Sequence, residues 1–98
     1  MPTFVMIGLD VPDSAKLREQ FHDQHVKHVT ALHEKGKIRL AGPMKSDDGE
    51  RSRGAVIVFE ADSLDEAYRI VEADPYVSGG VFEDVNVAPY LIYIPDKV

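Results

Sequence analysis

The sequence contains no cysteine, and its 98 residues include no long hydrophobic run. Without cysteine the chain forms neither disulfides nor thiolate metal sites, and it has no cysteine nucleophile. Its purely apolar runs are only a handful of residues long, far below the ~20 residues that cross a bilayer as a helix. The beginning, Met1-Pro2-Thr3, lacks the basic and apolar regions of a signal peptide. These absences predict a cytoplasmic protein that is not embedded in a membrane.

Basic residues are also scarce, because 11 lysines and arginines stand against 17 aspartates and glutamates, a formal net charge of −6. Such a chain repels phosphate backbones, which argues against nucleic acids and anionic membranes as partners. The length predicts one domain, residues 1–98, since domains usually span about 100–200 residues. A domain this small leaves much of its surface exposed, so an additional buried interface, as in a homodimer, is expected.

Hydrophobic periodicity and helix-breaking residues divide the chain into six predicted elements. Four segments rich in apolar and β-branched residues are predicted as strands: 3–9, 37–43, 54–60 and 81–94. Two segments with helical apolar spacing are predicted as helices: 15–35 and 63–73. Residues 44–53 are predicted as a loop, and residues 76–80 as a short connector.

The order of these elements, βαββαβ, predicts a ferredoxin-like α+β sandwich with two helices on one face of a four-stranded antiparallel sheet. Asp13 or Ser14 is expected to cap the first helix. Gly42-Pro43 is expected to end the second strand, and Pro89 inside the last strand indicates an edge position or a bulge. The other face of the sheet would be bare in a monomer, which again favours a dimer.

All four histidines lie in the first predicted helix, and His25 and His28 fall in the middle of its apolar stripe. A buried imidazole needs partners for its ring nitrogens, so a core histidine bonded to a backbone carbonyl or a water is one interpretation. The other is a histidine that lines a pocket, where an imidazole, with an ordinary pKa of about 6.5, suits proton transfer near neutral pH. No carboxylate on the same face completes a metal-binding pattern, and no metal is predicted.

Asp74 is the second candidate, at the end of the second predicted helix. The helix dipole disfavours a carboxylate there. It is either a simple turn residue before Pro75 or the partner that orients a histidine. The two helices would pack side by side on one sheet face, which allows contact. Tyr76 is close enough to line the same pocket, and Gly42 either lets a ligand approach the backbone or forms a turn.

These residues belong to an ordered set that resembles the YciI-like, or YCII-related, family over nearly the whole chain. The set comprises His25, Ala41–Pro43, the segment SLDEA at 63–67, Asp74-Pro75-Tyr76, Gly79-Gly80, and Val87 with Pro89. The resemblance implies a dimeric α+β barrel of two ferredoxin-like protomers, with a His–Asp pair in the pocket of each. These roles fall on His25 and Asp74. An enzyme similar to this family removes HCl from a chlorinated hydroxyhydroquinone.

The resulting expectation is a small cofactor-independent enzyme acting on a small aromatic or quinol-type substrate, as a lyase that eliminates HCl. His25 is the expected general acid and base with Asp74 as its partner, and the expected substrate-binding residues are His28, Tyr76 and Gly42. A non-catalytic small-molecule-binding or assembly module of the same fold is the alternative. RNA-binding domains share the element order but stack bases on sheet aromatics, of which segment 55–60 has one.

Overall fold

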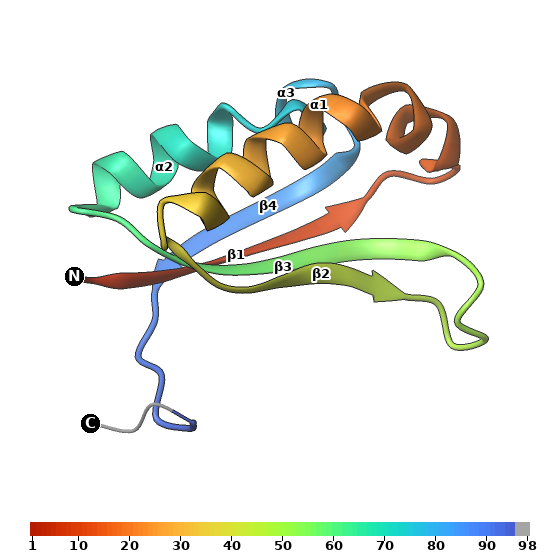
Figure 1. The fold of residues 1–98 in the computed structure, drawn as a ribbon. Helices are drawn as coiled ribbons and strands as arrows, with labels where there is room; N and C mark the ends of the chain where they lie inside the picture. Colours follow the sequence, from red (N-terminus) through yellow and green to blue (C-terminus); the bar gives the residue numbers. More distant parts are fainter. Residues whose placement is uncertain (96–98) are drawn as a thin grey trace.

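The computed structural model describes residues 1–95 and contains a four-stranded sheet covered on one face by helices (Figure 1). The predicted domain, 1–98, includes residues 96–98, which lie outside the described part. The strand order is β2-β3-β1-β4, and all neighbours are antiparallel. The elements are β1 (Thr3–Asp10), α1 (Ala15–Glu34), β2 (Ile38–Lys45), β3 (Ser52–Glu60), α2 (Leu64–Glu72), α3 (Pro75–Ser78) and β4 (Phe82–Pro89). The predicted α+β ferredoxin-like fold is confirmed, with the short helix α3 added.

The core lies between the helices and the inner face of the sheet. Alternate residues of β1 and β3 point inward, and the register places Phe4 beside Phe59 and Met6 beside Ile57. Each of these side chains is at most 8% exposed, and burying one stabilises the fold by about 1.5–3 kcal/mol. The apolar stripe predicted for α1 packs against this layer, for example through Phe21.

β2 continues through Gly42-Pro43, where the sequence predicts a break, and ends at Lys45. The reason is its edge position, because within residues 1–95 β2 pairs with β3 alone. Proline lacks a backbone N–H and is tolerated in an edge strand when its nitrogen faces away from the neighbour. The predicted loop 44–53 is correspondingly shorter, since β3 already begins at Ser52.

β4 ends at Pro89, so the prediction of a strand reaching Ile94 is wrong. In the described part of the chain β4 is paired only with β1, and Pro89 lies opposite Phe4 near the start of that partner. One residue past the end of β4, the Tyr90 N–H donates a 2.9 Å hydrogen bond to the Thr3 carbonyl of β1. Beyond this point the residues up to 95 have no partner strand, and the chain leaves the sheet (Figure 1).

The segment after α2 also differs from the prediction, because Pro75–Ser78 form a helical turn instead of an irregular connector. Asp74 is extended, with φ −70° and ψ 123°, and accepts a 2.9 Å hydrogen bond from the Tyr76 N–H, so it caps α3. Pro75 follows at the first helical turn, where a missing N–H is harmless. The Asp74 carboxylate therefore caps the N-terminus of α3. The C-cap of α2, where Asp74 was expected, is Ala73.

The outer face of the sheet, on the side away from the helices, is not covered by any helix within residues 1–95 (Figure 1). Ile7 and Leu9 of β1 are each 41% exposed, and Leu40 of β2 is 56% exposed. The register places Val56 and Val58 of β3 beside them. No helix within residues 1–95 is long and apolar enough to cross a membrane.

Candidate functional site

A pocket of about 650 Å³ lies between α1 and the inner face of β2 and β3. The sheet contributes apolar side chains to it, among them Pro43, Ala55 and Ile57. On α1 the lining includes Arg18 and His25, which are about two helical turns apart and therefore on the same side of the helix. An apolar cleft with a small number of polar groups is typical of sites for small organic ligands.

His25 and Asp74 meet where α1 packs against α3. The His25 Nδ1 lies 2.8 Å from the Asp74 Oδ1. The Asp74 side chain is buried, at 3% exposed, whereas that of His25 is 19% exposed. An ionised carboxylate only accepts hydrogen bonds, so Nδ1 is the donor and carries the proton of the neutral ring. The other nitrogen, Nε2, is then the basic one.

The His25 Nε2 is open to the pocket. It makes no hydrogen bond within residues 1–95, and in that part of the chain no buried side-chain nitrogen or oxygen lacks a partner. An atom without a partner is therefore accessible to solvent, and His25 lines the pocket. The pair thus offers a bound molecule a proton acceptor that is held in one orientation by a carboxylate.

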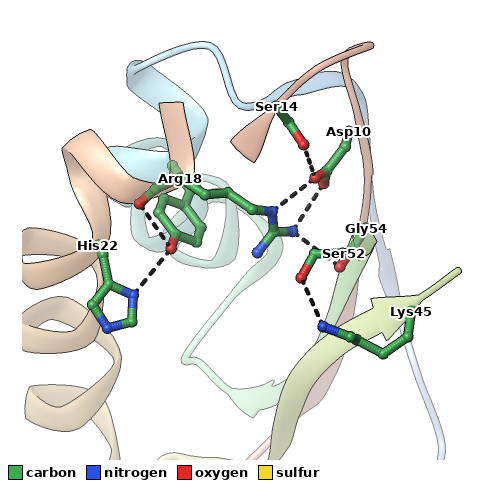
Figure 2. A network of polar contacts seen from close by, with 8 residues as sticks. Asp10, Ser14, Arg18, His22, Lys45, Ser52 and Gly54 are labelled. Carbon is green, nitrogen blue, oxygen red and sulfur yellow. Dashed lines mark hydrogen bonds and ion pairs between the residues drawn. The ribbon is translucent and has the colours of Figure 1, made fainter. Parts of the chain in front are cut away.

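Tyr76 of α3 fixes the plane of the imidazole. Its ring is parallel to that of His25, with centroids 3.8 Å apart and an interplanar angle of 3°. The Tyr76 hydroxyl donates to the Arg18 carbonyl at 3.3 Å and lies 3.4 Å from the His22 Nδ1 (Figure 2). Burial raises the pKa of the Tyr76 phenol above its usual value, so the hydroxyl keeps its proton and remains a donor.

A second polar cluster is centred on Arg18 (Figure 2), whose Cζ lies 5.1 Å from the Tyr76 ring centroid. The Arg18 Nε and Nη2 donate to the two carboxylate oxygens of Asp10 at 2.7 and 2.9 Å, and Nη2 also donates to the Gly54 carbonyl at 3.1 Å. Ser14 precedes α1, but its hydroxyl donates to Asp10 and makes no capping bond, contrary to the prediction. The hydrogen bonds to Asp10 raise the pKa of Arg18 above its usual value, so the guanidinium stays charged.

Arg18 and Asp10 are not among the site residues predicted from the sequence. One signal was present, because positions 18, 22 and 25 lie on one side of the predicted helix and therefore border the same space. Nothing in the sequence marks Asp10 as a site residue, since an aspartate between a strand and Pro12 is ordinary in a turn. Their pairing is a tertiary contact between β1 and α1.

The remaining predicted residues divide into two groups. Tyr76 and Gly42 line the pocket, and His28 does not. The His28 Nε2 donates to the Ile70 carbonyl of α2 at 3.0 Å, as expected of a core histidine bonded to backbone. Gly42 offers backbone only, because it pairs with Val56 on the outer face and a side chain there would point away from the pocket. Within residues 1–95, no three histidine, aspartate or glutamate side chains are grouped as metal ligands.

Three comparisons relate the chain to known proteins. The model of the YCII-related domain matches residues 3–91. Protein YciI of Escherichia coli O6:H1 is 33% identical over 92 residues, which cover 89% of this chain and 94% of that protein. The solved structure of 5-chloro-2-hydroxyhydroquinone dehydrochlorinase (TftG) from Burkholderia phenoliruptrix AC1100, in complex with 2,5-dihydroxybenzoquinone, is 28% identical with a TM-score of 0.79, covering 91% of this chain and 93% of that one. Rv0793 from Mycobacterium tuberculosis shares the fold, with a TM-score of 0.54 and 18% identity over 94% of this chain and 95% of its own. This chain therefore belongs to the YCII-related family, as the resemblance in its sequence predicts.

Proposed function

We propose that this protein is a small enzyme in which His25 and Asp74 carry out acid–base chemistry on an oxygen-substituted ring, eliminating HCl from a chlorinated hydroxyhydroquinone. The observation that carries the proposal is an imidazole in the wall of an apolar pocket, held at 2.8 Å by a buried carboxylate. The similarity to the Burkholderia dehydrochlorinase, at 28% identity over 91% of this chain, supports the choice of substrate.

In the proposed reaction one ring hydroxyl gives its proton to the Nε2 of His25. The imidazolium of His25 then returns this proton to the ring carbon that bears chlorine, so the ring becomes a non-aromatic tautomer with a carbonyl group. A second hydroxyl then loses its proton to the neutral His25, its electrons form a second carbonyl, and the C–Cl bond breaks with the electron pair on chloride. The sum is loss of HCl, and the ring ends as a quinone without an external oxidant. Asp74 stabilises the imidazolium that forms when His25 takes up a proton.

The pocket suits a substrate of this kind. Pro43, Ala55 and Ile57 would contact the faces of a flat ring, and the stacked rings of His25 and Tyr76 supply the polar end. The volume of about 650 Å³ falls within the roughly 300–1,000 Å³ of small-molecule sites.

Chloride release tests this proposal. Purified protein supplied with 5-chloro-2-hydroxyhydroquinone is expected to release chloride in proportion to the ring consumed, while the quinone product is followed by its visible absorption. Heat-denatured protein measures the spontaneous rate. A rate no higher than the spontaneous one, with saturable binding of the compound, would contradict catalysis and favour a non-catalytic binding module. Absence of binding as well would contradict both functions.

We also propose that the outer face of the sheet packs against a second copy of the chain. Ile7, Leu9 and Leu40 expose apolar side chains there, and face-to-face packing of two sheets would remove them from water. One patch that pairs with itself produces a closed two-fold dimer. The Ile7→Glu variant would place a charge in this interface, and it is expected to be monomeric because an unpaired buried charge is strongly unfavourable.

Light scattering after size-exclusion chromatography measures the effect of Ile7→Glu on mass. Wild-type protein is expected to have the mass of a dimer, and Ile7→Glu that of a monomer. Tyr68→Glu is the matched control, because Tyr68 is similarly exposed, at 43%, but lies on α2 and not on the sheet. A monomeric wild-type protein at high concentration, or a dimeric Ile7→Glu variant, would contradict the proposed interface.

A further inference from the structure

We infer that the pocket holds a ring that carries an apolar substituent, with the ring beside His25 and the substituent in the part of the pocket nearer the C-terminus of α1. This part is called the distal end here, and its lining residues are Val26, Val29, Thr30 and Ala41. The inference rests on the proposed function and deepens it, because it specifies the substrate class as rings that bear an uncharged alkyl or aryl group.

The pocket is larger than one ring requires. On α1 its lining begins at Arg18 and ends at Thr30, and this stretch of α-helix rises about 18 Å along its axis. A cavity of roughly 150 Å³ is enough to hold benzene, whereas this pocket has a volume of about 650 Å³. A single ring beside His25 therefore leaves a large part of the pocket unfilled.

The sheet extends in the same direction as the helix, and α1 lies over it along most of its length (Figure 1). Arg18 marks one end of the pocket, where its Nη2 donates to the Gly54 carbonyl near the start of β3 at 3.1 Å. Farther along β3, Ile57 pairs with Ala41 of β2, and both residues line the pocket. Ile57 also borders a small cavity together with Leu32, near the end of α1. The distal end is therefore the end of the pocket away from Arg18.

The side chains of the distal end are uncharged and mostly apolar. Three of its four lining residues carry only hydrocarbon, and the fourth is Thr30. Within residues 1–95, the lysine, arginine, aspartate and glutamate side chains that line the pocket all precede His25 on α1: Arg18, Glu19 and Asp23. Lys27 and Glu34 border a different groove on α1 and not this pocket. An ionised substituent would lose water here without gaining an ionic partner, which is unfavourable, so an alkyl or aryl group is the class that fits.

The described residues, 1–95, leave Val26 largely uncovered. This residue is 43% exposed although it lines an apolar pocket. Val29 lies one helical turn after His25 on the same side of α1, so a substituent on a ring beside the imidazole extends toward both valines. Packing an alkyl or aryl group there removes hydrocarbon of the ligand and of the protein from water, which stabilises the complex.

Binding of three ring compounds tests the inference without turnover. Isothermal titration calorimetry under nitrogen compares hydroquinone, 2-phenylhydroquinone and 2,5-dihydroxyphenylacetate, whose substituent carries a negative charge. Wild-type protein is expected to bind phenylhydroquinone at least about tenfold more tightly than hydroquinone, because the phenyl group buries apolar surface. The carboxylate compound is expected to bind no more tightly than hydroquinone. Equal affinities for hydroquinone and phenylhydroquinone would overturn the inference, and an equal gain from the carboxylate substituent would contradict the apolar class.

Thr30→Phe places a larger apolar side chain at the distal end. The ratio of the phenylhydroquinone and hydroquinone affinities is expected to fall to about one, because the new ring occupies the space of the phenyl substituent. Ala31→Phe is the matched control, since Ala31 is equally classed as exposed and follows directly on α1 but does not line the pocket. Its ratio is expected to equal that of wild-type protein. A ratio that survives Thr30→Phe, or that falls equally in Ala31→Phe, would contradict the location.

Ala41→Phe fills the distal end from the sheet and is expected to lower the same ratio. It replaces Thr30→Phe if circular dichroism shows that variant to be unfolded, and a wild-type ratio in a folded Ala41→Phe would equally contradict the location. Chloride release separates the inference from the proposed function. Absence of release with the preference for phenylhydroquinone intact would contradict dehydrochlorination alone, whereas release without that preference would contradict the inference alone.

Discussion

Replacing His25 with alanine is expected to lower the rate of chloride release from 5-chloro-2-hydroxyhydroquinone by about 10²–10⁴-fold, the usual contribution of a positioned acid–base group. The side chain is 19% exposed in the pocket wall, but it also stacks on Tyr76 and bonds the buried Asp74, so its loss is expected to lower the stability of the fold as well. The measurement is kcat at saturating substrate, with the melting temperature as a check on folding.

His33→Ala is the matched control for this experiment. It removes an imidazole from the same helix at an exposed position that does not line the pocket. Its turnover is expected to equal that of wild-type protein. Wild-type turnover in His25→Ala would contradict the role assigned to His25, and an equal loss in both variants would indicate damage to α1 and not to the chemistry.

Asp74→Asn is expected to lower turnover strongly while changing stability little. Asparagine retains a side-chain oxygen for the 2.9 Å cap on the Tyr76 N–H, and the two residue types cap helices about equally well. The variant loses the negative charge that keeps the His25 Nδ1 protonated and stabilises the imidazolium. The equivalent change in a Ser–His–Asp triad costs about 10⁴-fold, and we expect a decrease in kcat of roughly 10²-fold or more.

Asp74→Ala separates the capping role from the chemical one. It removes the same charge and also the cap of α3, so its free energy of unfolding is expected to be about 0.5–2 kcal/mol lower than that of Asp74→Asn. Urea denaturation of both variants measures this difference. Full turnover in Asp74→Asn would mean that the 2.8 Å contact is structural only, and equal stability of the two variants would contradict the capping role.

The sequence was sufficient to identify the helix that carries His25, but not α3, whose N-cap is Asp74. Apolar spacing placed His25 on the buried side of a helix, and Pro75 marked the end of the second helix beside Asp74, because both signals are local. The 2.8 Å contact depends on how α1 packs against α3, and no local pattern determines it. The pairing was expected only because the ordered set of residues resembles a family.

Features that depend on neighbours in space were not predictable in this way. β2 passes through Pro43 and β4 stops at Pro89, because each is an edge strand whose length follows from its single neighbour. A proline therefore lies inside the strand at one edge of the sheet and ends the strand at the other edge. Arg18 was missed for a similar reason, since its role depends on Asp10 from another element.

The central claim is that the His25 imidazole is held at one nitrogen by Asp74 and meets the ligand with the other. The direct measurement is an NMR titration of ¹⁵N-labelled histidine side chains with 2,5-dihydroxybenzoquinone. We predict that the Nδ1 of His25 stays protonated and bonded to Asp74, while the Nε2 signal shifts saturably as the ligand enters. An Nε2 signal that does not respond at saturating ligand would contradict the claim.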